Sequence, residues 1–276
     1  MTVKKPSTGT TQTEGHGAPT ETPNRRGEEY YDLDTGAIYK SIGTEGPWNW
    51  AYVGRGMLTS FNKDTIPGMV LWLDSSDDSS FVKDSGGLVS QWNDLSGNSR
   101  HFSQTTATYK PIFTPNYKNS LPAVIFDGSN DFLVAPSFTQ AQPFTIFVVG
   151  RYISLESQRY MLGCNNADPL GLDSSASKWG MYFGTGVVGL AMNINYHIFT
   201  ATINSTSTIQ QIDATISTAL NPGTSSIVSN IYLGSGNNGG YTGNVAVSAL
   251  LMYSGTLSTA DKTTVQTMLN NKFAIY

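Results

Sequence analysis

Acidic residues that could act as a catalytic pair are scarce in this sequence. Hydrolysis of a glycosidic bond usually requires two carboxylates about 5–9.5 Å apart, one of which donates a proton. Residues 66–276 contain a single glutamate, Glu156, and no D-x-D or D-x-x-D pair falls inside a run that reads as a central strand. We therefore expect no hydrolysis by paired carboxylates.

Histidine and cysteine do not form a recognisable catalytic or metal motif either. His16, His101 and His197 are far apart, and none has a second histidine three to five residues away, as metal sites often do. Cys164 follows Met-Leu-Gly, so core packing explains it better than nucleophilic chemistry. The sequence predicts that the protein is not an enzyme.

Calcium is the one cofactor that the residue pattern suggests. Asp127, Asn130 and Asp131 lie close together around Gly128, and their oxygens are the ligands that Ca²⁺ prefers. The alternative is a tight turn, in which the same side chains accept hydrogen bonds from nearby backbone amides. The absence of an EF-hand-like spacing with a bidentate acid favours the turn.

A glycine-rich loop is the first candidate for binding a glycan. Residues 234–243 read GSGNNGGYTG and contain Asn237, Asn238 and Tyr241. A sugar has apolar faces and many hydroxyls, so aromatic rings and amides suit it. A mobile hairpin connection explains the same loop without a ligand. Trp179 is a further candidate, either as a sugar platform or as a core residue.

The elements that must position these residues are mostly strands. Short apolar or alternating runs are separated by clusters of Gly, Asn, Asp, Ser and Pro, which predicts a sandwich or barrel. The runs are 69–73, 89–92, 123–126, 144–151, 178–183, 198–203, 227–233 and 245–253. One helix is expected at the end, because Ser258 and Asp261 form a capping-box-like start before an apolar stripe. The stripe consists of Val265, Met268, Leu269 and Phe273.

The N-terminal quarter differs in composition from the rest. Residues 1–24 are almost entirely polar and are expected to form an extended tail that cannot bury enough surface to fold alone. Residues 25–65 predict a small hairpin module and linker, with Tyr30 and Tyr39 flanking a turn. Trp48, Trp50 and Tyr52 alternate and so share one face of a strand. We expect these five aromatic residues to anchor a partner.

The net charge and the short apolar stretches argue against nucleic acid and membrane as partners. The formal net charge is -4 and no cluster of Lys and Arg is present, which argues against nucleic-acid binding. No apolar stretch approaches the roughly 20 residues that span a bilayer, so we expect no membrane insertion. One cysteine rules out an internal disulfide, and no secretory signal pattern opens the sequence. We expect synthesis in a reducing cytoplasm.

Three segments together carry a resemblance to a known family. PGMVLWLDSSD (67–77), VSQWNDLSGNSRHFSQ (89–104) and PAVIFDGSNDFLV (122–134) resemble the opening of concanavalin A-like, laminin G-like jelly rolls in phage and bacterial surface proteins. Residues 247–273 are similar to that family's last strand and terminal helix. The resemblance implies an all-β concanavalin A-like sandwich over 66–276 with a C-terminal helix. The N-terminal module is similar to small modules of bacteriophage virion proteins.

The resemblance implies a structural protein on the virion surface, made in the host cytoplasm. It would be a head fibre, capsid decoration or tail-associated protein, with residues 1–56 attached to capsid or tail subunits and the sandwich displayed outward. A homotrimer is an expectation of the same resemblance. The alternative is a host-surface glycan-binding adhesin. A depolymerase is disfavoured by the missing pair of carboxylates.

Overall fold

The computed structural model describes residues 3–6, 11–15, 20, 22, 28–32, 37–41, 50–55, 66–237 and 239–276. The chain divides into two compact units, one of Met1–Asn62 with Thr263–Ala274 and the other of Lys63–Lys262 with Ile275–Tyr276. Each unit is described by itself below. None of the helices in these described stretches is long and apolar enough to cross a membrane.

The first unit contains a five-stranded sheet in chain order. Its strands are β1 (Val3–Pro6), β2 (Thr11–Gly15), β3 (Glu29–Asp32), β4 (Ala37–Ser41) and β5 (Trp50–Arg55). The sequence predicted an extended tail over 1–24, but β1 and β2 lie within it. The two strands pair with each other antiparallel, and β2 also pairs in parallel with β3, so strand pairing supplies hydrogen bonds to the backbone of this polar segment.

The predicted hairpin is present in this sheet. Strands β3 and β4 pair antiparallel with Tyr30 opposite Tyr39, and the two rings meet edge to face at 6.3 Å. Trp50 begins β5, and Tyr52 lies opposite Tyr39. Trp48 falls outside the described residues. The anchoring role of these aromatics stays a prediction.

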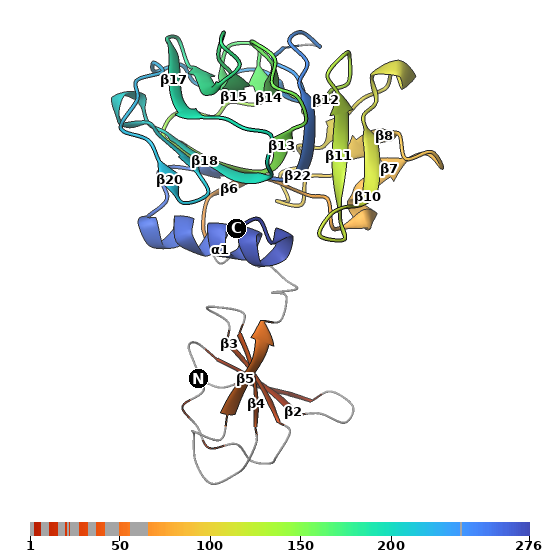
Figure 1. Ribbon diagram of the computed structural model, residues 1–276, viewed down its shortest axis with the longest axis vertical. Helices are drawn as coiled ribbons and strands as arrows, with labels where there is room; N and C mark the ends of the chain where they lie inside the picture. Colours follow the sequence, from red (N-terminus) through yellow and green to blue (C-terminus); the bar gives the residue numbers. More distant parts are fainter. Residues whose placement is uncertain are drawn as a thin grey trace. The chain divides into compact units, whose positions relative to one another are not determined.

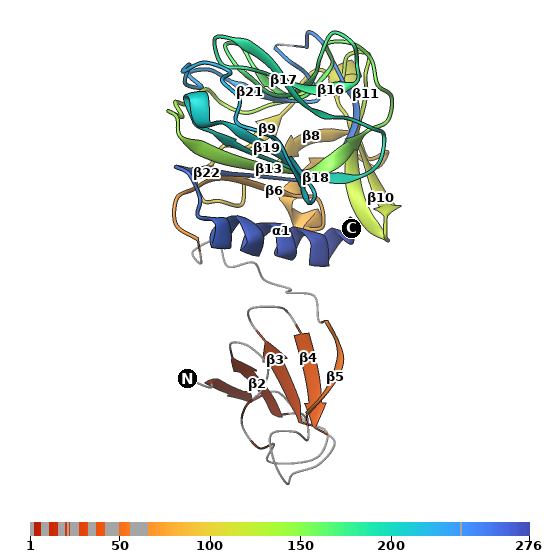
Figure 2. The same cartoon turned by 60° about the vertical axis from the view of Figure 1, so that its left-hand side comes forward.

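The second unit is a β-sandwich, as the sequence predicted. Figures 1 and 2 show its two layers, with β14, β15 and β17 in one and β6, β13, β18 and β22 in the other. The eight-stranded sheet runs β10-β11-β22-β13-β18-β19-β20, with β6 also paired to β22. Its strands are β6 (Met69–Asp74), β10 (Ile112–Lys118), β11 (Leu121–Asp127), β13 (Phe144–Tyr152), β18 (His197–Ile203), β19 (Ile209–Ile212), β20 (Thr215–Ile216) and β22 (Asn244–Ser254).

The nine-stranded sheet runs β17-β16-β15-β14-β21-β12-β9-β8-β7. Its strands are β7 (Phe81–Lys83), β8 (Val89–Trp92), β9 (Phe102–Ser103), β12 (Leu133–Val134), β14 (Tyr160–Cys164), β15 (Asp168–Leu172), β16 (Lys178–Tyr182), β17 (Gly186–Ala191) and β21 (Ile231–Leu233). Three single-turn 3₁₀ helices lie between strands, at Asp78–Ser80, Ala107–Tyr109 and Ser205–Ser207.

One apolar core fills the space between the two sheets. Phe144, Ile146 and Val148 alternate along β13 and face this core, because successive side chains of a strand point to opposite sides. Trp92 is fully buried and stacks on Phe81 at 4.9 Å between ring centroids. The burial of such aromatic surface supplies the main driving force for folding.

The predicted C-terminal helix is α1 (Thr259–Phe273). The Ser258 hydroxyl donates to Asp261 Oδ2 at 2.7 Å and accepts the Asp261 amide at 3.1 Å, which confirms the predicted start. The four residues of the predicted apolar stripe are all buried.

Candidate functional site

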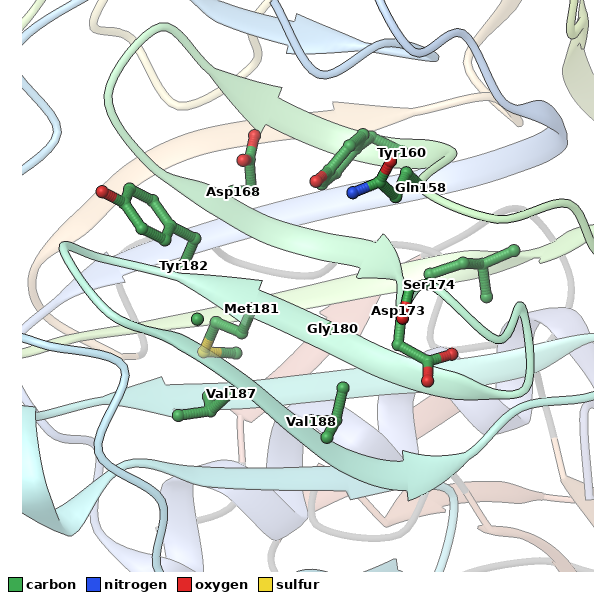
Figure 3. A pocket seen from close by; sticks show the side chains of 12 residues that line it. Gln158, Tyr160, Asp168, Asp173, Ser174, Gly180, Met181, Tyr182, Val187 and Val188 are labelled. Carbon is green, nitrogen blue, oxygen red and sulfur yellow. The ribbon is translucent and has the colours of Figure 1, made fainter.

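A groove of about 520 Å³ crosses β14, β15, β16 and β17 on the nine-stranded sheet. Figure 3 shows the side chains that line it. Its lining includes three kinds of side chain. Tyr160 and Tyr182 are aromatic, Asp168 and Gln158 carry a carboxylate and an amide, and Val187 and Val188 are apolar. These residues come from different strands, so the sheet brings them together.

The alternation of β16 exposes one aromatic ring and buries another. Trp179 and Met181 face the core, so Gly180 and Tyr182 face outward. Tyr182 keeps 44% of its surface exposed. Gly180 has no side chain to fill the space beside it. The outward face of β16 is therefore a shallow floor with an aromatic ring at its end.

Tyr160 is held in one orientation by two glycines. A Cβ placed on Gly171 would lie 2.3 Å from Cδ1 of Tyr160, and one on Gly236 would lie 2.9 Å from Cδ2. The ring therefore packs directly on backbone at both positions. Tyr241 meets it edge to face at 5.9 Å, and the Tyr160 amide donates to the Tyr241 carbonyl at 3.1 Å. Such a ring is a preorganised surface for a ligand.

Asp168 gives the groove a carboxyl group with an altered proton affinity. Burial raises its pKa to about 7, although a hydrogen bond from the Cys164 backbone acts in the opposite direction. Burial, the nearby Asp168 and Tyr241 raise the pKa of Tyr160 to about 12. At neutral pH the groove thus offers a protonated phenol and a carboxyl group close to its titration midpoint.

Asp173 lines the same groove but does not form a pair with Asp168. Figure 3 shows the two side chains at opposite ends of β15. An extended strand separates residues five apart by about 16 Å, well beyond the roughly 5–9.5 Å of a glycosidase pair. Asp173 Oδ1 also accepts the amides of Ser177 and Lys178 at 2.9 and 3.0 Å. Its position fits a turn-stabilising residue.

Replacement of Asp168 by Asn should change how stability depends on pH. The raised pKa means that the folded protein disfavours the ionised form. The stability that Asp168 contributes is therefore complete below about pH 4, its pKa when unfolded, and is lost as the pH rises to about 7. Urea unfolding of both proteins from pH 4 to 8 should show Asp168→Asn gaining relative to wild type, and parallel curves would contradict the assignment.

The residues predicted to bind a glycan lie in different parts of the structure. Trp179 is fully buried and donates its Nε1–H to the Pro169 carbonyl at 2.9 Å, so it is a core residue and cannot be a sugar platform. Tyr241 is 53% exposed and supports the groove through Tyr160. Asn237 is exposed but does not line the groove, and Asn238 lies outside the described residues.

Sequence reasoning missed Tyr160, Tyr182, Asp168 and Gln158. The alternation Trp-Gly-Met-Tyr over 179–182 contained a usable signal, since it places Trp and Met on one face and leaves Tyr182 on the other. Tyr160 and Asp168 had no comparable local signal. Their proximity depends on the pairing of β14 with β15.

The acidic turn proposed as a calcium site has the geometry of the local alternative. Asp127 Oδ1 accepts the amides of Ser129, Asn130 and Asp131 at 2.8, 3.2 and 3.4 Å, and Asp131 Oδ2 accepts the Asp127 amide at 3.1 Å. Burial raises the pKa of Asp131 to about 6, partly opposed by this last hydrogen bond. No group of three His, Cys, Asp or Glu suited to a metal occurs among the described residues. Calcium binding stays a prediction.

The surroundings of Cys164 and His197 in the fold explain both residues without catalysis. Cys164 is buried, and burial, with a smaller effect of Asp168, raises the pKa of its thiol well above the ordinary value. The neutral thiol is the unreactive form. Nδ1 of His197 lies 2.6 Å from Asp213 Oδ2, and Nε2 lies 2.9 Å from Asn193 Oδ1. Both ring nitrogens are already occupied.

Solved structures similar to this chain share its fold at low sequence identity. No protein-family model matches the chain, and no curated protein sequence matches it. A Trypanosoma rangeli sialidase in complex with 2,3-difluorosialic acid has a TM-score of 0.51 and 14% identity, covering 88% of this chain and 44% of its own. A second similar structure is domain 4 of AbnA, a GH43 extracellular arabinanase from Geobacillus stearothermophilus, in complex with arabinotriose. It has a TM-score of 0.51 and 11% identity, and the match covers 72% of this chain and 99% of the arabinanase domain.

The binding domain of botulinum neurotoxin serotype D is a third similar structure, with a TM-score of 0.50 and 10% identity, covering 72% of this chain and 50% of its own. This chain thus spans less than half the length of the sialidase and about half that of the toxin domain. At these identities the likeness establishes the β-sandwich fold.

Proposed function

We propose that the protein binds a neutral saccharide in the groove over β14–β17. The observation that carries the proposal is the convergence of Tyr160 and Tyr182 with Asp168 and Gln158 in one groove. Tyrosine rings cover the apolar faces of a sugar, while the carboxyl and amide groups bind its hydroxyls. A few fixed polar groups among aromatic and apolar side chains are typical of ligand sites.

The charge of the groove selects against acidic sugars. Asp168 and Asp173 are its ionisable acids, and no Lys or Arg lines it among the described residues. A sugar carboxylate or sulfate would meet like charge without a compensating cation. The proposal therefore differs from the ligand of the similar sialidase structure and agrees in class with arabinotriose, bound by the similar arabinanase domain.

A glycan array followed by calorimetric titration tests this function. Neutral oligosaccharides should bind in a way that depends on Tyr182, and any binding of acidic ones should be independent of Tyr182. Tyr182→Ala should weaken the binding about tenfold or more, because an aromatic contact contributes about 0.5–1.5 kcal/mol beyond the area it buries. Tyr109→Ala is the matched control, since Tyr109 is 40% exposed but lies away from the groove. Equal affinities of the Tyr182 and Tyr109 variants would overturn the assignment of this groove.

We further propose that the saccharide-binding sandwich is displayed on a virion, with residues 1–56 attaching it to capsid or tail subunits. Support comes from the resemblance of 67–77, 89–104 and 122–134 to surface jelly rolls, and from the aromatic pair Tyr30 and Tyr39 in the N-terminal sheet. In this setting the groove would make the protein an adhesin as well as a structural subunit.

Removal of residues 1–56 tests the attachment. The remaining chain should keep its saccharide affinity in calorimetry and should no longer copurify with assembled particles. Full-length Tyr182→Ala is the reverse control, because it should bind the saccharide about tenfold or more weakly and still join the particle. Assembly of the truncated chain at the wild-type level would show that attachment lies elsewhere.

A further inference from the structure

A second pocket, of about 410 Å³, lies among strands of the eight-stranded sheet. Lys118 is the last residue of β10, Arg151 the penultimate residue of β13, and His197 the first residue of β18. The other lining residues are Asn195, Tyr196, Asp213 and Ile275. No residue of this pocket, called the Arg151 pocket below, lines the groove.

Two positive charges in the Arg151 pocket have no anionic partner. Neither Lys118 nor Arg151 forms an ion pair within the described part of the chain. Nε of Arg151 is inaccessible to solvent and has no hydrogen-bond partner there. Because a buried donor without an acceptor is unfavourable, the fold itself does not satisfy the whole guanidinium group.

Asp213 is the acidic side chain among the described residues that line the pocket, and both of its oxygens are engaged. Asp213 Oδ2 lies 2.6 Å from Nδ1 of His197, and its Oδ1 accepts the Ile198 amide at 2.8 Å. Asp213 therefore holds the start of β18 in place and does not pair with Arg151. The local balance of Lys118, Arg151 and Asp213 stays positive.

The wall beside the cations is rigid. Tyr196 is only 7% exposed, and its hydroxyl lies 2.8 Å from the hydroxyl of Ser248. Nζ of Lys118 lies 6.0 Å from the centre of the Tyr196 ring, within reach of a cation–π interaction. A ligand would thus meet side chains that are already ordered, which lowers the entropic cost of binding.

We propose that the Arg151 pocket binds an oxyanion, the carboxylate or sulfate group of an acidic saccharide or the equivalent inorganic ion. The planar guanidinium of Arg151 donates to the oxygens of such a group, and Lys118 adds a second charge. This site is separate from the groove and takes the opposite ligand class. Together with the proposed function, this gives the protein a site for neutral sugars on one sheet and a site for anions on the other.

Calorimetric titration of the full chain at low ionic strength tests the proposal with sodium sulfate, glucuronate and glucose. Sulfate, glucuronate or both should bind, and glucose should not compete for the bound anion. Arg151→Gln should weaken the binding about tenfold or more, and Lys118→Gln by a smaller factor. Lys110→Gln, which removes the same charge elsewhere, should have no effect.

The arms of this experiment separate the sources of the anion. Binding of glucuronate alone identifies an acidic saccharide, and binding of sulfate identifies a general oxyanion site. Thermal melts check that Arg151→Gln folds, and if it does not, Lys118→Gln carries the comparison. Absence of saturable binding by either anion, or an equal loss in Lys110→Gln, overturns the proposal.

Discussion

Trp179→Ala is expected to lower the free energy of unfolding by about 3–5 kcal/mol, the range for removing a buried aromatic side chain. The ring is fully buried in the core between the sheets, where it meets Phe199 of β18 edge to face at 5.7 Å. The substitution also removes the hydrogen bond that Trp179 Nε1–H donates to the Pro169 carbonyl. Urea unfolding followed by circular dichroism measures the loss.

Tyr182→Ala, three residues along the same strand, is the control for this prediction. Its ring points outward and is 44% exposed, so its removal should change the free energy of unfolding by less than about 1 kcal/mol. The two variants should separate stability from binding. Similar unfolding midpoints for both would mean that β16 does not alternate between core and groove as the structure shows.

Gly171→Ala is expected to destabilise the fold by about 1–3 kcal/mol, the usual cost of overpacking. The added Cβ would lie 2.3 Å from Cδ1 of Tyr160, so the ring must move. Displacement of the ring should also weaken saccharide binding, because Tyr160 forms part of the groove. Unfolding curves and calorimetric titration of the same variant measure the two effects.

A double-mutant comparison identifies the cause of that loss. In a Tyr160→Ala background the clash is gone, so Gly171→Ala should cost much less than in wild type. Gly186→Ala is the matched glycine control, since a Cβ at this position of β17 meets nothing within 4 Å. An undiminished cost in the Tyr160→Ala background would place the strain in the backbone and not against the ring.

Much of the fold could be predicted from sequence because it depends on local patterns. The run over 144–151 became β13, the run over 245–253 became β22, and Ser258 with Asp261 marked the start of α1. Alternation and capping are properties of neighbouring residues, so the sequence alone contains them. The strands within the polar segment over 1–24 were not predicted, because they depend on the pairing of β1 with β2 and of β2 with β3 and have no apolar pattern.

The candidate site was largely decided by tertiary structure. Period-two alternation shows that Trp179 and Tyr182 face opposite sides of a strand but not which side meets the core. Tyr160 and Asp168 meet only because β14 pairs with β15, and Arg151 and Lys118 share a pocket although they belong to non-adjacent strands. The sequence by itself determined the elements and their amphipathic faces. Strand order and sheet packing, which depend on contacts between distant residues, determined which side chains form a site.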